Sequence, residues 1–167
     1  MWRLFLYLSQ QTNWASSMYK LSGEYRIKLD EKSRLRLPTA LIRQLSSSTS
    51  IRLVIHRGIE KCLLLYPQEV WEEKTKEVNQ LNLYNSKKRA FARYFHRGAT
   101  ELIVDSADRI LIPKSLAEHA GIKQDIVLNA YINQIEIWDQ EEYLNMIANE
   151  PEDFSSIAEE VFRQKDV

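Results

Sequence analysis

Two short segments of the chain carry an aspartate followed four residues later by an arginine. They are Asp30 to Arg34 within LDEKSRLRLP and Asp105 to Arg109 within VDSADRILIP. Across a turn, such a carboxylate can accept backbone amides and orient the guanidinium. An arginine fork can grip a phosphate or a guanine through two hydrogen bonds. Each pair is therefore either an anion-binding site or only a structural clasp, and the sequence leaves both interpretations open.

Further cations surround the first arginine. Arg26 and Lys28 precede the turn, Lys32 lies in it, and Arg36 follows it. Such a surface attracts phosphates, because each neutralised phosphate releases counterions. We therefore predict double-stranded DNA as the partner. The predicted DNA-binding residues are Arg34, Arg109, Lys32, Arg36, Arg26 and Lys28, with Asp30 and Asp105 as turn-orienting residues. A second basic run at 87–89, with Arg93 and Arg97, is either another contact region or a solvated helix face.

Residues for catalysis or metal binding are poorly represented. Cys62 opens the apolar run CLLLY, which is typical of a buried small hydrophobe rather than a nucleophile. The three histidines are dispersed and fall in no metal-ligand spacing. With four glycines in the chain there is little room for a phosphate-cradling loop. We therefore expect that the protein is not an enzyme and that it binds no metal, cofactor or small-molecule substrate.

The two Asp–Arg segments belong to an internal duplication. Five identities recur at an offset of 75 residues, and apolar positions between them agree in type. The identical pairs are Gly23/Gly98, Asp30/Asp105, Arg34/Arg109, Pro38/Pro113 and Leu41/Leu116. Later pairs such as Leu65/Ile137 sit at an offset of 72, so the first copy carries three extra residues in a turn. A shared register of this kind predicts two copies of one structural unit.

Each copy repeats the same order of predicted elements. Alternation predicts a strand before each aspartate and another after it, with Leu35 and Leu37 inward and Arg34 and Arg36 outward. Proline then opens a short helix, and Gly121 is a natural stop for the second one. A hairpin ends each copy, at 51–67 and at 125–139. Helices are expected at 67–81, 86–98 and 140–150, and an amphipathic tail helix is either a docking helix or a frayed end.

One such unit is too small to bury its own apolar face, whereas two copies packed together can close a small barrel. We therefore predict an α+β fold, mainly β, with flanking helices. The predicted organisation is a flexible N-terminal extension (1–17), copy one with its following helix (18–80), a linker helix (81–97), copy two (98–147) and an acidic tail (148–167).

Charge divides between the two halves of the chain. Residues 1–97 hold 18 Lys and Arg against 8 Asp and Glu, and residues 98–167 hold 5 against 15, so the net charges are +10 and −10. This asymmetry suggests that the halves face different partners.

No apolar run approaches the roughly 18 residues that a membrane span needs, and a single cysteine suits a reducing cytosol. We expect a cytoplasmic protein with no membrane partner.

The motifs resemble those of a known family. They are Gly23-Glu24-Tyr25, Leu29-Asp30-x-Lys32-x-Arg34-Leu35-x-Leu37-Pro38 and CLLLYPQEVW (62–71) in copy one, with Gly98-Ala99-x-Glu101, Asp105-x-x-x-Arg109-Ile110-Leu111-Ile112-Pro113, Ala120-Gly121 and Ile135-Glu136-Ile137-Trp138 in copy two. In this order, over 19–143, the sequence resembles the MraZ family of bacterial transcriptional regulators within the AbrB-like swapped-hairpin superfamily.

This resemblance implies a pseudo-twofold swapped-hairpin β-barrel and a ring-like homo-oligomer. It also implies a nucleoid-associated regulator, expected to be a repressor, that binds short tandem promoter repeats of the division and cell wall gene cluster. The family usually has glycine before the motif arginine, where this chain has Ser33 and Asp108. Because glycine there suits a positive φ angle, we expect the same turn with slightly altered geometry, most of all around Ser33.

The copies differ on their predicted outer faces. Where copy one has Arg26, Lys28 and Arg36, copy two has Glu101, Ile103 and Leu111. We therefore hypothesise that copy one meets DNA while the outer face of copy two meets a helix or a neighbouring subunit. The alternative, from another functional class, is an AbrB-like protein-interaction or antitoxin module that uses the acidic tail 139–167 to neutralise a partner.

Overall fold

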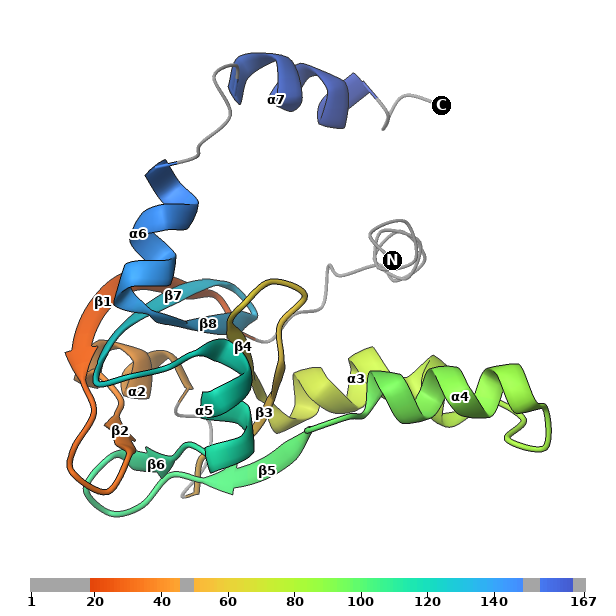
Figure 1. The fold of residues 1–167 in the computed structure, drawn as a ribbon, viewed down its shortest axis with the longest axis horizontal. Coiled ribbons are helices and arrows are strands. Elements are labelled where there is room, and N and C mark those ends of the chain that lie inside the picture. Colours follow the sequence, from red (N-terminus) through yellow and green to blue (C-terminus); the bar gives the residue numbers. More distant parts are fainter. Residues whose placement is uncertain (1–18, 46–49, 149–153, 164–167) are drawn as a thin grey trace.

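The computed structural model describes residues 19–45, 50–148 and 154–163 as eight strands and six helices (Figure 1). The strands are β1 (Leu21–Lys28), β2 (Arg34–Arg36), β3 (Arg52–Arg57), β4 (Leu63–Pro67), β5 (Thr100–Ile103), β6 (Arg109–Leu111), β7 (Asp125–Ile132) and β8 (Gln134–Asp139). The helices are α2 (Thr39–Leu45), α3 (Gln68–Asn79), α4 (Ser86–Phe95), α5 (Lys114–Ala120), α6 (Gln140–Ala148) and α7 (Phe154–Arg163). The extension predicted at 1–17 lies outside the described residues.

The predicted elements are present in both copies. Both hairpins form, as β3 with β4 and as β7 with β8, and every described strand pair is antiparallel. The prolines lie one position earlier than predicted, because the Pro38 and Pro113 carbonyls accept the first helical hydrogen bonds and helix begins at the next residue. Gly121 ends α5 in the left-handed conformation at φ 63°, as the sequence predicts.

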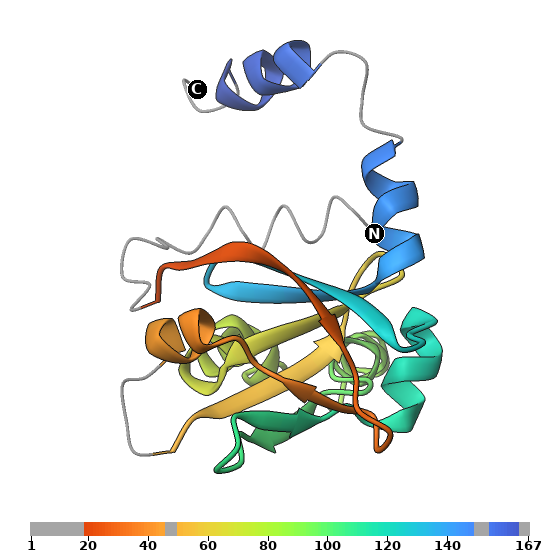
Figure 2. The same cartoon turned by 90° about the vertical axis from the view of Figure 1, so that its left-hand side faces the viewer.

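Strand pairing exchanges segments between the copies. The larger sheet has the order β1-β7-β8-β4-β3-β5, so the first strand of each copy pairs with the hairpin of the other copy. The chain then runs from each edge strand through an Asp–Arg turn into β2 or β6, and these two pair with each other as a separate ribbon. Figure 2 shows this ribbon at the end of the core away from α6. The copies are therefore interleaved rather than side by side.

The register follows the duplication. Leu35 pairs with Ile110 at the centre of the β2–β6 ribbon, and these positions are equivalent at the offset of 75. Leu64 pairs with Glu136 at the centre of the β4–β8 pair, and these are equivalent at the offset of 72. Equivalent positions of the two copies therefore pair with each other, as a local twofold relation between the copies requires.

One hydrophobic core joins the two copies. Leu35 and Ile110 are 0% and 2% exposed, and both belong to the same cluster of buried side chains. Leu41 of α2 and its equivalent Leu116 of α5 are also buried there. Around this core, α3 packs on β3 and β4, and α6 packs on β7 and β8. In Figure 1, α3 and α4 project together to one side of the sheets, whereas α6 stands at the other side.

Because the core is shared, damage to either copy should destabilise the whole molecule. We expect Leu35→Ala and Ile110→Ala each to lower the free energy of unfolding by about 2–5 kcal/mol. Urea denaturation should show one transition for each variant, and the double variant should depart from additivity because the side chains belong to paired residues. The control is Ile103→Ala at a 64% exposed position. A Leu35→Ala cost no larger than that of the control would contradict the shared core.

Candidate nucleic-acid interface

The turn of copy one is organised by Asp30. One carboxylate oxygen, Oδ1, accepts hydrogen bonds from the backbone N–H groups of Lys32 and Arg34, each at 2.9 Å. The other, Oδ2, accepts from Arg34 Nε at 2.6 Å. Backbone hydrogen bonds from Asp30 N to Arg34 O (3.1 Å) and from Ser33 N to Asp30 O (2.9 Å) close the turn. The aspartate thus shapes the turn and aims the guanidinium at the same time.

The turn of copy two reproduces this arrangement. Asp105 Oδ1 accepts from the N–H groups of Ala107 and Arg109 at 2.8 and 3.0 Å, and Oδ2 accepts from Arg109 Nε at 2.9 Å. One difference is that Arg109 Nη2 also lies 2.9 Å from Oδ2. Both arginine side chains are about one third exposed. Arg34 therefore keeps more of its donors available for a partner than Arg109 does.

At the two positions where the family usually has glycine, the backbone of this chain keeps the positive φ angle that glycine favours. Ser33 has φ 56° and Asp108 has φ 60°, both in the left-handed region. Both copies form the expected turn, since in each the backbone N–H of the motif arginine donates to Oδ1 of the aspartate. Holding a non-glycine residue at positive φ costs about 1–2 kcal/mol, and aspartate bears this conformation better than serine.

The two turns also hold each other in place. Leu37 N donates to Asp108 O at 2.8 Å, and the equivalent Ile112 N donates to Ser33 O at 3.4 Å. Each left-handed residue therefore offers its carbonyl to the strand of the other copy. This exchange places one Asp–Arg turn at each end of the β2–β6 ribbon.

The outward face of the ribbon gathers arginines from both copies. Leu35 and Ile110 point into the core, so Arg34, Arg36, Arg109 and Leu111 lie on the opposite face. In the register, Arg36 is directly opposite Arg109, and Arg34 is directly opposite Leu111. We call Arg34, Arg36 and Arg109 the ribbon arginines. Like charges directly opposite across an antiparallel pair repel, so this face is suited to an anionic partner.

The remaining predicted cations are placed differently. Lys32 is exposed in the turn of copy one, next to the ribbon. Lys28 lies opposite Asp125 in the β1–β7 pair, with Nζ 3.6 Å from Oδ1. Arg26 lies opposite Val127, which is buried in a small cluster with Tyr143 of α6. The structure thus brings Arg34, Arg36 and Arg109 together, with Lys32 beside them, but places Arg26 toward α6.

The outer face of copy two is not separate from the basic face at the ribbon. Leu111 is 56% exposed and sits beside Arg34, while Ile103 is 64% exposed on β5 and Glu101 is also exposed. No described element covers these side chains. The predicted division of the two copies onto different faces therefore does not extend to β2 and β6, because antiparallel pairing interleaves them.

Sequence reasoning missed the Arg36–Arg109 neighbourhood. Alternation assigned both residues to outward faces, but nothing in the spacing joined a residue of one copy to a residue of the other. The second basic cluster runs from Lys87 to Arg93 on α4 and ends at Arg97, just after this helix, away from the ribbon (Figure 1). Its helix begins after Asn85, whose side chain accepts from Lys87 N and Lys88 N.

Other chemical sites find no support in the described part of the chain. Burial, together with the nearby carboxylates of Glu136 and Glu60, raises the pKa of the Cys62 thiol to about 12, so the side chain is an inert buried thiol. Residues 19–45, 50–148 and 154–163 contain no cluster of three His, Cys, Asp or Glu side chains able to hold a metal. Within the same ranges, no helix is both long and apolar enough to cross a membrane.

Comparison with known proteins agrees with the duplication. The family model described as "MraZ protein, putative antitoxin-like" matches twice, over residues 21–94 and 95–165. The chain belongs to the MraZ family. It is 41% identical over 150 residues to the transcriptional regulator MraZ of Christiangramia forsetii, covering 89% of this chain and 97% of that protein. It is 39% identical over 145 residues to the MraZ of Flavobacterium psychrophilum, covering 86% and 92%.

Membership in the MraZ family confirms the predicted resemblance and the two repeats. These relatives are transcriptional regulators rather than enzymes, as the sequence predicts. A more distant relative, the MraZ of Natranaerobius thermophilus, is still 34% identical over 139 residues, covering 83% of this chain and 94% of that protein. The similarity spans both copies and both Asp–Arg turns.

The left-handed turn residues give a direct stability prediction. We expect Ser33→Gly to raise the free energy of unfolding by up to about 1 kcal/mol, because glycine reaches positive φ without steric cost. Asp108→Gly should give a smaller gain, since aspartate tolerates this region better. Urea denaturation of both variants measures the difference. A loss of stability in Ser33→Gly would show that the serine side chain, rather than the backbone, decides this turn.

Acid should weaken both turns. Hydrogen bonds from the backbone and side chain of Arg34 hold the pKa of Asp30 below its usual value of 3.8. At Asp105, partial desolvation alone would raise the pKa, but hydrogen bonds from Arg109 and Ala107 outweigh it and the net shift is downward. A lowered folded-state pKa means that stabilisation is complete above the unfolded value and is lost as pH falls through the folded one.

We therefore expect NMR titration of the two carboxyl carbons to show midpoints below 3.8. Asp30→Asn should show a smaller loss of stability than the parent between about pH 4 and pH 2, measured by urea denaturation. Midpoints at or above the usual value would mean that the observed hydrogen bonds do not form in solution.

Proposed function

We propose that the chain is a sequence-specific DNA-binding regulator that contacts double-stranded DNA through the ribbon arginines. The observation that carries this proposal is the pair of equivalent Asp–Arg turns at the two ends of one interleaved ribbon. Asp30 uses Arg34 Nε and leaves the terminal nitrogens of the guanidinium for a partner. These nitrogens form the fork that suits phosphate oxygens or the O6 and N7 atoms of guanine.

Electrostatics supports a polyanion as the partner. Arg36 lies directly opposite Arg109, and the Asp105 carboxylate already pairs with Arg109, so a phosphate adds most on the side of Arg36. Lys32 adds an exposed charge at the edge of the same surface. Arg26 and Lys28 then extend the positive field along β1 toward α6 and act mainly by attracting the duplex over longer range.

We further propose how this unit is organised. Residues 18–80 and 98–147 form the two halves of a swapped-hairpin barrel, in which the ribbon closes the open side of the larger sheet. Several such units assemble into a ring-like homo-oligomer in the cytoplasm, associated with the nucleoid. Tandem promoter repeats of the division and cell wall gene cluster then bind several ribbons at once, so that modest single contacts sum to a useful avidity and repress transcription.

The test of the contact surface is a matched pair of variants. We expect Arg34→Ala to weaken binding to DNA from the chain's own promoter by at least about tenfold and to reduce the salt dependence by about one phosphate contact per ribbon. Glu101→Ala, an exposed position on β5, should bind as the parent does. Fluorescence anisotropy over a range of salt concentrations measures both quantities.

Folding must be checked in the same experiment. Urea denaturation separates loss of contact from loss of the turn, since Arg34 also bonds to Asp30. Arg36→Ala is a second probe that leaves the Asp30 turn intact, and it should also weaken binding. If the Arg34, Arg36 and Glu101 variants all bind equally well, the assignment of this surface to DNA is wrong.

The alternative is an AbrB-like protein-interaction or antitoxin module. It is favoured by the exposed amphipathic helix α7 in the acidic half of the chain. Under this alternative, promoter DNA would shift only at very low salt, where any basic surface binds a polyanion. Retention of binding at physiological salt, with preference for the promoter repeats over unrelated DNA, distinguishes the regulator from the module.

A further inference from the structure

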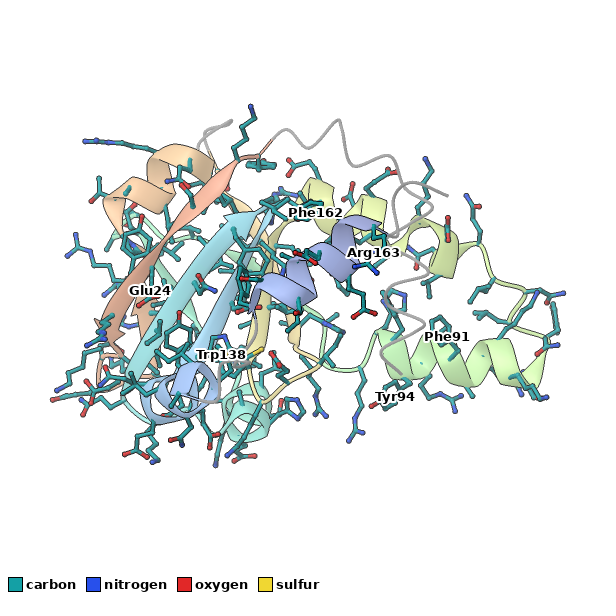
Figure 3. All side chains as sticks on the ribbon, turned by 90° about the horizontal axis from the view of Figure 1, so that it is seen from above. Glu24, Phe91, Tyr94, Trp138, Phe162 and Arg163 are labelled. Atoms are coloured by element: carbon teal, nitrogen blue, oxygen red, sulfur yellow. The ribbon has the colours of Figure 1, made fainter. Side chains whose placement is uncertain are left out.

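A groove opens beside the α3–α4 helices, far from the ribbon. It encloses a cavity of about 240 Å³ whose walls include Tyr66, Trp71, Phe91, Tyr94 and Phe95. The rings contact one another, with centroid distances of 6.1 Å for Trp71–Phe95 and 5.9 Å for Phe91–Phe95. Figure 3 shows Phe91 and Tyr94 on α4, and Tyr94 is 60% exposed. We call this surface the aromatic groove.

Cations line the aromatic groove, and none of its lining residues is acidic. They are Arg57, Lys74 and Arg97. His119 also lines the groove, but burial and the charges of Arg57 and Arg97 lower its pKa, so its imidazole is neutral near pH 7. The Nε atom of Arg57 is buried without a hydrogen-bond partner among the described residues. Lys74 lies 5.1 Å from the centre of the Tyr66 ring, and burial lowers its pKa to about 8. An apolar floor with a cationic rim suits an apolar side chain carried by an acidic segment.

The size of the cavity narrows the type of occupant. Sites for small organic ligands usually enclose about 300–1,000 Å³, so 240 Å³ is small for them. It is ample for one or two apolar side chains. The groove therefore fits the mode in which an amphipathic helix inserts anchors spaced three, four or seven residues apart.

Helix α7 has this chemistry. Phe154, Ile157 and Val161 follow helical spacing and are 67%, 42% and 54% exposed, and no residue of the helix is buried. Glu159 and Glu160 lie on the same helix and are exposed. The segment from 149 to 167 holds six acidic against two basic residues. Its apolar stripe and its charge both complement the aromatic groove.

We propose that α7 of one copy of this chain docks in the aromatic groove of a second copy. The inference deepens the assembly part of the proposed function and rests on it. A second copy is the occupant because α6, which leads to α7, stands at the opposite side of the molecule from α4 in both Figure 1 and Figure 3. Exposed Leu144 and Ile147 of α6 extend the apolar surface toward the same partner.

Disulfide trapping between two differently tagged chains tests the docking. One full-length chain carries Tyr94→Cys in the groove, the other carries Ile157→Cys in α7, and they are co-expressed and oxidised. The native Cys62 is only 2% exposed and so stays out of the reaction. We expect a disulfide-linked pair of chains on a non-reducing gel, at least about tenfold more abundant than with Tyr84→Cys in place of Tyr94→Cys. Tyr84 is 97% exposed and lies outside the groove.

A second set of variants tests the chemistry of the contact. Val161→Glu in the Ile157→Cys chain should abolish the cross-link without affecting folding, because Val161 is exposed. A single chain that carries both cysteines, diluted with excess wild-type chain, reports docking within one molecule. An intramolecular disulfide there, or a cross-link no stronger than that of the Tyr84 control, would overturn the proposal.

The same variants separate this inference from the proposed function. Arg34→Ala should weaken DNA binding and keep the cross-link, since Arg34 lies on the ribbon and not in the groove. Loss of the cross-link with retention of promoter binding would reject the docking and leave the regulator intact. Cross-linking of the Tyr94→Cys and Ile157→Cys chains, combined with no binding of promoter DNA by the parent chain, would reject the regulator and leave the docking intact.

Discussion

The antiparallel pairing of β2 with β6 is the constraint on which the rest of the structure depends. Each strand comes from a different copy, and Leu35 meets Ile110 at its centre. Because each strand is only three residues long, the ribbon is stable only when its inner side chains complete the core. The exchange of hydrogen bonds between Leu37 and Asp108, and between Ile112 and Ser33, then sets the position of both turns. The fold and the candidate interface therefore form together.

The Asp–Arg turns connect this pairing to function. The Asp30 carboxylate accepts hydrogen bonds from two backbone N–H groups and from Arg34 Nε, so most of its hydrogen bonds stabilise the turn itself. Its contribution to function is to present the guanidinium in one orientation on a short, well-packed ribbon. An exposed ion pair contributes little stability, so the conformation it imposes is of more consequence than its energy. Strain at Ser33 and Asp108 is sustained because the surrounding hydrogen bonds determine the turn.

Charge is distributed in agreement with two different contact surfaces. The ribbon arginines lie at one end of the core, and the aromatic groove with its cationic rim lies beside α3 and α4. The acidic half of the chain supplies α7, which carries an exposed apolar stripe. Although the net charge of the chain is zero, its basic residues are concentrated in its first half. The ribbon arginines suit a DNA duplex, and the aromatic groove suits an acidic helix.

The sequence by itself determined the duplication, the alternation of each strand, the helix stop at Gly121 and the local geometry of both turns. The duplication follows from comparing the sequence with itself, and the other features depend on residues a few positions apart, so the sequence alone predicts them. Only the tertiary structure decided that Arg36 lies opposite Arg109, that Leu111 lies beside Arg34, and that Arg26 faces α6 instead of the ribbon. Such neighbours come from segments more than 70 residues apart in the chain. Their register depends on how the two copies share one core, which no local pattern shows.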